Sequence, residues 1–167
     1  MVMKVSDIAG VFKEGARPNR FKVTITGPKS LPNMEFLCRA ANQPASTLGE
    51  IAVPYQGRVY KIPGDRTFED WTVTVYNDKD HEIRKQLEDW HREMNEYEQN
   101  TSSAVMTSIM STGTVEQLGL DGSTIHSYTI GDCWPSEVGA IDLAWDNNDA
   151  VEEFTVTWKV QFINPGT

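Results

Sequence analysis

Residues 64–77 read Gly64-Asp65-Arg66-Thr67-Phe68-Glu69-Asp70-Trp71-Thr72-Val73-Thr74-Val75-Tyr76-Asn77. Trp71, Val73 and Val75 alternate with polar residues, which is the period of two expected for a β-strand with one face in a core. The charged residues before Trp71 are typical of a turn, in which we expect Arg66 to bridge a carboxylate of its own or a neighbouring chain. The stretch therefore predicts a polar turn that leads into an amphipathic strand.

The same alternation recurs near both ends of the chain. Single polar residues separate five apolar ones, Phe154, Val156, Trp158, Val160 and Phe162. Residues 21–26 repeat the pattern over a shorter length. Thr, Lys and Gln fill most of the gaps, so we expect one face of each strand to pack in a core. The other face should meet water or the polar surface of a partner.

Length and charge limit the classes of protein that the chain can belong to. At 167 residues it fits a single domain that spans residues 1–167 and buries about two thirds of its unfolded surface. The net charge of -9 argues against an ordinary nucleic-acid-binding protein. The first 12 residues contain no continuous apolar segment, and no later run is apolar enough to span a bilayer. We therefore expect a soluble, intracellular chain without membrane insertion.

The first 64 residues predict an arm, a hairpin and a long excursion. Residues 1–17 are expected to form a polar N-terminal arm or a short helix. Residues 20–26 and 34–40 are expected to pair as a hairpin across two turn signals. Residues 41–64 contain three prolines and three glycines beside short alternating runs. This composition predicts a projecting loop with a short ribbon in it, and long excursions from compact domains are usually functional.

One amphipathic helix is predicted at residues 78–98, capped by Asn77 or Asp78. Its apolar residues follow one another at spacings of three and four, namely Ile83, Leu87, Trp90, Met94 and Tyr97. The remaining positions are mostly charged or polar. We interpret the helix as a cover for one open end or side of a β-sheet core.

Two further hairpins follow the helix in the prediction. Residues 115–120 and 123–130 flank an Asp121-Gly122 turn, and Trp134-Pro135 is expected to end that hairpin. Residues 139–145 and 151–162 flank the polar turn at 146–149. Seven or eight strands and one helix predict a mainly β fold, a sandwich or barrel flanked by the helix. Cys38 and Cys133 are expected to be small core residues rather than a disulfide.

No catalytic or metal-binding pattern is recognisable in the sequence. The three histidines, His81, His91 and His126, lack zinc-ligand spacing, and we expect the first two to be solvated helix residues. The signatures of serine hydrolases and phosphate-binding loops are missing. Clusters of carboxylates such as the one at residues 65–70 are expected by chance in a chain with 24 acidic residues. We therefore predict a protein that is not an enzyme and has neither a cofactor nor a metal site.

The chain resembles the tail tube proteins of contractile-tailed, T-even-like bacteriophages. The resemblance is most specific in residues 64–75, in Trp134-Pro135 with Val138-Gly139, and in Trp145-Asp146. It implies two packed antiparallel sheets with a flanking helix. It also implies hexameric rings that stack into a hollow tube inside the contractile sheath, through which DNA is ejected into the host cell.

The resemblance also implies a location and partners. The protein would be part of the virion tail, assembled in the host cytoplasm. Its partners would be other copies of itself, the tail sheath protein, the baseplate tube initiator, the tape measure protein and the tail terminator. DNA would pass through the lumen without specific binding. If part of the acidic charge faced the lumen, DNA would be repelled from the wall.

Three groups of residues are our candidates for assembly and stability. The projecting loop is expected to connect stacked rings, with contacts from Glu50, Tyr55, Arg58 and Tyr60. Salt bridges within the turn or between subunits are expected from Asp65, Arg66, Glu69 and Asp70. The core and sheet residues are expected to be Trp71, Trp134, Trp145, Phe154, Trp158 and Phe162. The charged face of the helix is a candidate contact for the sheath.

Two alternatives stay open at this point. A tube protein of a type VI secretion system or of a phage-derived bacteriocin would share this architecture. From a different class, a small β-barrel that binds a ligand also combines alternating strands with one helix. A monomeric barrel with an apolar cavity would favour that second alternative.

Overall fold

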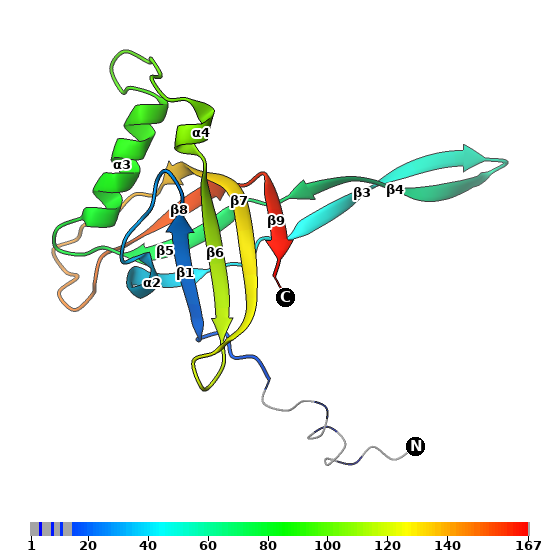
Figure 1. The fold of residues 1–167 in the computed structure, drawn as a ribbon, viewed down its shortest axis with the longest axis horizontal. Coiled ribbons are helices and arrows are strands. Elements are labelled where there is room, and N and C mark those ends of the chain that lie inside the picture. Colours follow the sequence, from blue (N-terminus) through cyan, green and yellow to red (C-terminus); the bar gives the residue numbers. More distant parts are fainter. Residues whose placement is uncertain (1–3, 5–7, 9–10, 12–14, 167) are drawn as a thin grey trace.

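Two antiparallel sheets form the body of the protein (Figure 1). The computed structural model describes residues 4, 8, 11 and 15–166, so most of the predicted N-terminal arm lies outside the described residues. One sheet has the order β1 (Phe21–Thr26), β6 (Ser111–Leu118), β7 (Thr124–Val138) and β9 (Phe162–Pro165). The other has the order β7, β8 (Glu153–Lys159), β5 (Trp71–Tyr76) and β2 (Cys38–Ala41). The predicted mainly β fold of two packed sheets is confirmed.

Strand β7 belongs to both sheets. Its first half pairs with β6 and β9, where Thr129 lies opposite Thr114 and Asn164. Its second half pairs with β8, where Trp134 lies opposite Lys159. Between the halves Asp132 has a φ of 49°, a left-handed conformation that redirects the chain. The β6–β7 hairpin ends at Cys133, directly before Trp134-Pro135 as predicted. Strand β7 itself continues to Val138, because a shift in register after Pro135 accommodates the proline.

The core lies between the sheets and beneath helix α3 (Glu82–Met94). Val23, Val115 and Ile130 enter it from one sheet, and Val73, Phe154 and Val156 from the other. Ile83, Leu87 and Trp90 are the buried residues of α3, so the predicted helical stripe is confirmed over three of its five positions. The indole of Trp158 packs against those of Trp71, at 5.8 Å between ring centroids, and Trp90, at 5.5 Å.

The helix is shorter than predicted because the chain turns before it. His81, in a left-handed conformation with φ of 52°, is the residue that precedes the first turn. The Oδ1 atom of Asp78 still accepts a hydrogen bond from the backbone N–H of Glu82 at 3.0 Å, so the predicted capping side chain is used. Tyr97 lies beyond the end of the helix and is exposed.

The predicted hairpin between residues 20–26 and 34–40 is wrong. Residues 34–37 form a single helical turn, α2 (Met34–Leu37), which starts after Asn33 in a left-handed conformation and buries Met34. The chain thereby crosses between the sheets, and β1 pairs with β6 while β2 pairs with β5. By contrast, the hairpin predicted around Asp121-Gly122 is confirmed, with longer strands β6 and β7. Another single turn, α4 (Met106–Ile109), precedes β6.

The predicted C-terminal hairpin is also wrong. Residues 139–152 form a loop without a strand, so Trp145 lies outside the sheets and is fully exposed in the subunit. The alternating stretch breaks after Lys159, and Phe162 starts β9 in the opposite sheet. The ring of Phe162 covers Gly131, where an added Cβ would lie 2.0 Å from it. Cys133 is buried and Cys38 half-buried, both as free thiols.

Candidate assembly surfaces

A long two-stranded hairpin projects from the body, formed by β3 (Ser46–Tyr55) and β4 (Arg58–Phe68). Figure 1 shows it extending away from both sheets. Every residue of the two strands is exposed except Gly64 and Phe68, which are half-buried. Gln56 and Gly57 connect the strands with φ of 44° and 78°, as in a tight hairpin turn of the kind that matches strand twist. The predicted projecting excursion is thus a regular hairpin that extends to residue 68.

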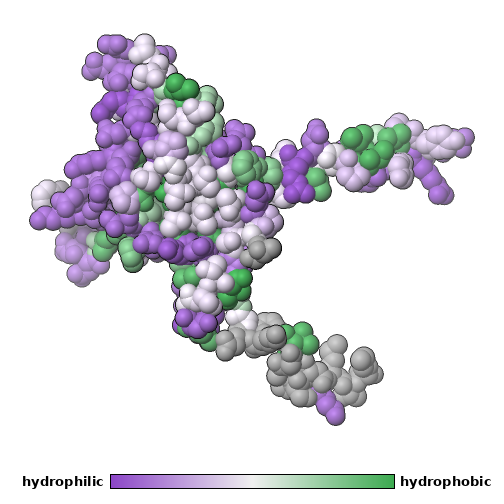
Figure 2. Space-filling model, in the orientation of Figure 1, coloured by the Kyte–Doolittle hydropathy of each residue, from purple (hydrophilic) through white to green (hydrophobic). Residues whose placement is uncertain are grey.

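One face of this hairpin is apolar. Ile51 lies opposite Ile62 and Val53 opposite Tyr60, and all four side chains are exposed. Figure 2 shows apolar surface in the middle of the projection. Two strands alone are marginally stable in water and leave their outer edges unpaired. This face and these edges are therefore candidates for contact with another protein.

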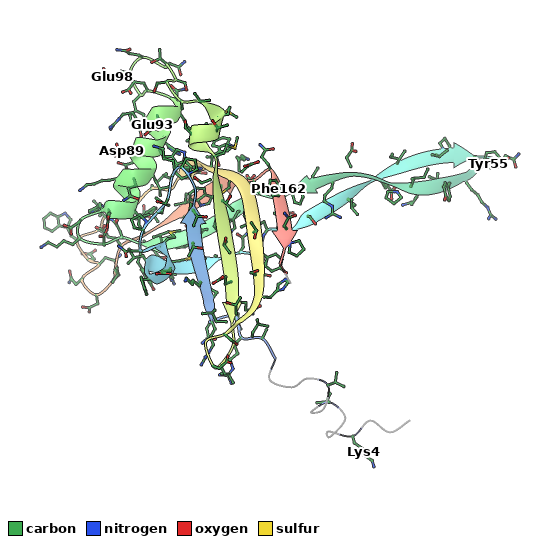
Figure 3. All side chains as sticks on the ribbon, in the orientation of Figure 1. Lys4, Tyr55, Asp89, Glu93, Glu98 and Phe162 are labelled. Atoms are coloured by element: carbon green, nitrogen blue, oxygen red, sulfur yellow. The ribbon has the colours of Figure 1, made fainter. Side chains whose placement is uncertain are left out.

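The predicted stacking residues lie in different parts of the hairpin. Tyr55 and Arg58 lie opposite each other at the tip of the hairpin, where Figure 3 labels Tyr55. Tyr60 lies on the apolar face. Glu50 forms an ion pair with Lys61 at 2.9 Å. At the tip, the structure gives Arg58 no ion pair with any described residue.

The turn predicted at residues 64–70 is mostly strand. Gly64–Phe68 belong to β4, with Arg66 opposite Leu48, and the chain bends only at Glu69 and Asp70. The carboxylate of Asp70 pairs with Lys159 at 2.6 Å. Within the described part of the chain, Asp65, Arg66 and Glu69 form no ion pair, so an inter-subunit role for them stays a prediction.

The outer face of the sheet β1–β6–β7–β9 is rich in hydroxyl groups and carries little net charge. Thr24 lies opposite Thr114, which in turn lies opposite Thr129. Lys22 lies opposite Glu116 and also pairs with Glu35 at 2.9 Å. The hydrogen bond that Lys22 donates to the Glu35 carboxylate raises the pKa of Lys22 above its ordinary value. In Figure 2 this region is pale, neither strongly hydrophilic nor hydrophobic.

Helix α3 carries much of the acidic surface on the opposite side from the hairpin. Figure 3 labels Asp89, Glu93 and Glu98 along this edge. Basic residues accompany the helical carboxylates, since Asp89 pairs with Arg92 at 3.0 Å and Glu93 with Lys29. The edge is therefore a surface of mixed charge with an acidic excess at its end.

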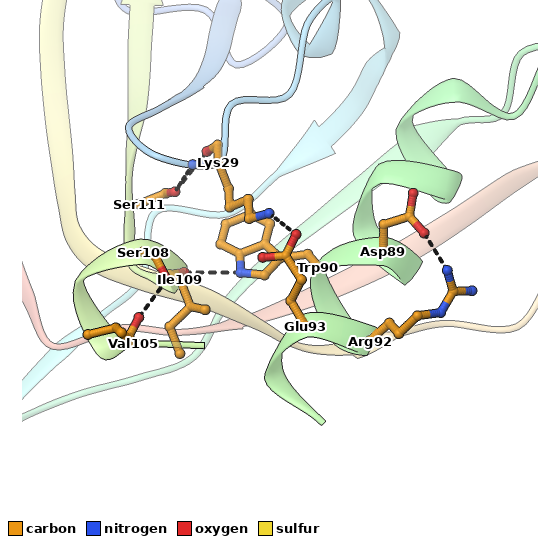
Figure 4. A network of polar contacts seen from close by, with 9 residues as sticks. All are labelled: Lys29, Asp89, Trp90, Arg92, Glu93, Val105, Ser108, Ile109 and Ser111. Carbon is orange, nitrogen blue, oxygen red and sulfur yellow. Dashed lines mark hydrogen bonds and ion pairs between the residues drawn. The ribbon is translucent and has the colours of Figure 1, made fainter. Parts of the chain in front are cut away.

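Hydrogen bonds fix the helix to the body. Trp90 Nε1 donates to the backbone oxygen of Ile109 at 3.0 Å, which connects α3 to α4 (Figure 4). His91 Nε2 lies 3.1 Å from the oxygen of Pro135 in β7. His81 Nδ1 lies 2.7 Å from Asn77 Nδ2. Both histidines thus have protein partners, and the expectation of purely solvated helix residues is wrong.

An exposed acidic segment at residues 139–152, here called the acidic loop, replaces the predicted strand at 139–145, the polar turn at 146–149 and the start of the strand predicted at 151–162. It contains Asp142, Asp146, Asp149 and Glu152 and no lysine or arginine. Trp145 is 100% exposed and Leu143 80% exposed. The loop borders a groove of about 670 Å³ beside Arg39 and Tyr76. The sequence signal for an exposed segment here was the polar run Asp146-Asn147-Asn148-Asp149 directly after Trp145.

The described part of the chain holds no group of three or more His, Cys, Asp or Glu residues arranged to bind a metal ion. Burial raises the pKa of the Cys38 and Cys133 thiols to about 11, so both stay protonated near neutral pH. Within the same residues, no helix has the length and apolar character needed to cross a membrane.

Comparisons with known proteins point to one family. Residues 16–162 match the family described as phage tail tube protein. The tail tube protein gp19 of Enterobacteria phage T4 is 33% identical over 163 residues, covering 96% of this chain and 99% of the relative. A chain in the baseplate of the anti-feeding prophage has a similar fold, with a TM-score of 0.71 at 12% identity over 92% of this chain and 97% of that one. A chain of the extracellular contractile injection system PVC, solved as a sheath-tube complex, gives 0.63 at 13% identity over 99% of both chains.

Proposed function

The chain belongs to the phage tail tube protein family, and from this premise we propose that it forms hexameric rings that stack into the hollow tube of a contractile tail. It is a structural component of the virion tail, not an enzyme. The observation that carries the proposal is the combination of a two-sheet body with a long projecting hairpin whose apolar face is uncovered. Such a subunit has an incomplete surface that another copy completes.

The hydroxyl-rich face of the sheet β1–β6–β7–β9 is our candidate for the channel wall. Closing six such sheets into a ring would pair the strand edges that are otherwise free to aggregate. On this face the charges of Lys22 and Glu116 balance, and threonines fill the centre. DNA would then slide because the wall offers it neither cations to bind nor a strong repulsive field. The wall would thus be nearly neutral, and not acidic as it would be if part of the net charge of the subunit faced the lumen.

The hairpin is our candidate for the connection between subunits and between stacked rings. Stacking requires different surfaces above and below each ring, and an element that projects beyond the body can reach a neighbour. Because almost all of its residues are exposed, the subunit loses little core packing if the hairpin is removed. Assembly and folding are therefore separable by mutation.

The charged edge at α3 is our candidate contact for the sheath. The PVC relative of similar fold was solved in complex with its sheath, and tube and sheath are expected to meet on the outer side of the ring. The tail terminator, the baseplate tube initiator and the tape measure protein are proposed partners at the tube ends and in its lumen. The identity with a phage T4 tube protein favours DNA rather than a protein effector as cargo.

The alternative of a ligand-binding barrel has little to support it. Trp71, Trp90 and Trp158 fill the space between the sheets and the helix, and each is at most 1% exposed. An apolar ligand would have to displace these close-packed indoles, which is costly in a well-packed core. The tube of a type VI secretion system or bacteriocin shares the fold, and the T4 relative favours the phage tail over both.

The test is assembly of the purified chain. Light scattering and negative-stain electron microscopy should reveal rings or hollow rods built on six copies. A variant in which a Gly-Ser turn replaces residues 47–67 should keep its circular dichroism spectrum and melting transition, because Ser46 and Phe68 lie opposite each other at the base of the hairpin. That variant should form no long tubes. A wild-type chain that stays monomeric at every concentration, even with a tube-initiator complex, would overturn the proposal.

A further inference from the structure

We propose that the hairpin tip of one copy docks on the acidic loop of the next copy, where Tyr55, Arg58 and Tyr60 meet Trp145 and its neighbouring aspartates. The hairpin tip is defined here as residues 55–60. The inference rests on the proposed function, because it assumes that copies of this chain assemble. It adds the partner surface that receives the hairpin.

The hairpin tip has the composition of a binding anchor. Tyr55 is 69% exposed and Tyr60 68% exposed, and Arg58 is also exposed between them. Tyrosine and arginine are enriched among residues that dominate binding energy at protein interfaces, together with tryptophan. Within the subunit, Arg58 has no carboxylate partner among the described residues, so its charge is available to a neighbour.

The acidic loop offers the complementary features. A fully exposed tryptophan two residues from an exposed leucine is unusual on the surface of a lone protein, and exposed apolar patches commonly mark interaction sites. Asp142, Asp146 and Asp149 surround Trp145 in sequence, and no lysine or arginine of the loop compensates them. Guanidinium groups pair with carboxylates and stack on indole rings, so Arg58 suits both parts of this surface.

The positions of the two surfaces fit a head-to-tail contact. In Figure 1 the hairpin tip lies at one end of the longest axis of the molecule, and the connection between β7 and β8, drawn in pale orange, lies near the other end. The two surfaces of a single subunit are therefore too far apart to meet. A contact between copies that uses different surfaces is heterologous, the type that builds rings and filaments. Contacts of tip with tip or loop with loop would instead bring like charges together.

Charge reversal tests the pairing. Arg58→Glu and Asp146→Arg should each raise the protein concentration at which tubes form by about tenfold or more, as expected for loss of a close charge pair at an interface. The double variant should recover most of this loss, since the pair is restored with its signs exchanged. The matched control for Arg58→Glu is Lys85→Glu, which makes the same change of charge on the exposed side of α3 and should assemble normally. If the double variant lost as much assembly as the two single variants lose together, the contact would be overturned.

Cross-linking between two labelled populations tests the geometry directly. One carries Gln56→Cys in the turn of the hairpin tip and the other Asn147→Cys in the acidic loop, both in a Cys38→Ser background. After co-assembly and mild oxidation, a disulfide-linked heterodimer should form, while Lys85→Cys paired with Gln56→Cys should give none. Tubes that form without the heterodimer would overturn this contact and leave the tube function standing. Failure of the unmodified chain to assemble at all would overturn both.

Discussion

The two buried indoles beside each other in the core provide a matched pair of substitutions. Trp90 is 1% exposed and Trp158 0% exposed, and their ring centroids lie 5.5 Å apart. Trp90 Nε1 donates a hydrogen bond to the oxygen of Ile109 at 3.0 Å. Trp158 Nε1 is buried and has no hydrogen-bond partner among the described residues. Replacing each by phenylalanine removes the same atoms, but only at Trp90 does the change remove a hydrogen bond.

The expected difference in stability follows from those hydrogen bonds. Both substitutions lose apolar contacts and leave a small cavity, and these costs are similar for the two sites. Trp90→Phe also leaves the buried oxygen of Ile109 without its donor, which costs about 1–3 kcal/mol. Trp158→Phe removes a buried donor that has no protein acceptor and therefore carries no such cost. We expect Trp90→Phe to lower the free energy of unfolding by about 2 kcal/mol more than Trp158→Phe.

The assay is urea denaturation followed by far-ultraviolet circular dichroism. It is run at a concentration where light scattering gives the mass of a single subunit, so that assembly does not contribute to stability. Equal slopes of free energy against urea would show that the variants unfold like the parent. Equal losses of stability in the two variants would refute the reasoning, because the hydrogen bond between α3 and α4 would then contribute nothing measurable.

Three further predictions concern packing, thiol ionisation and a surface ion pair. Gly113→Ala should cost about 1–3 kcal/mol in the same denaturation assay, since its Cβ would lie 2.6 Å from the ring of Trp71, and an unchanged midpoint would contradict this. Alkylation of Cys38 and Cys133 should accelerate up to pH about 11, because burial raises both pKa values from 9.0 to about 11, whereas a plateau near pH 9 would contradict the burial. Folding favours the protonated thiols, so the stability they contribute is complete below pH 9 and is lost as the pH rises toward 11. Asp70→Asn should change stability by under about 1 kcal/mol, since its ion pair is exposed, and a larger loss would show that it is more than a surface contact.

Much of the core was predictable because its strands alternate strictly. Trp71, Val73 and Val75 are all buried, as are Phe154, Val156 and Trp158, because each strand has one face toward the helix and the opposite sheet. The helix was predictable for the same reason, since its apolar stripe has the period of a helix with one buried side. Alternation reports which side chains are buried and carries no information on which strand pairs with which.

Strand pairing was predicted less well, and the errors lie where the chain passes from one sheet to the other. The last alternating stretch looks continuous from Phe154 to Phe162, yet it serves two sheets, with Phe162 covering Gly131 of β7. Both of the wrong hairpins came from assuming that neighbours in sequence pair in space.

The acidic loop was missed for a different reason. Trp145 was predicted as a core or sheet residue at the end of a strand at 139–145, whereas it is fully exposed, as the aspartates and asparagines after it indicate.

The sharing of β7 by both sheets has a mechanical consequence. Where two layers touch only through apolar side chains, a sideways force can make one slide over the other without breaking a backbone bond. Here one covalent strand runs through both layers and is hydrogen-bonded to β6 and β9 in the first and to β8 in the second. Any shear between the layers must break several of those ladders together. A subunit built in this way resists being deformed, which suits a conduit that is driven forward under load.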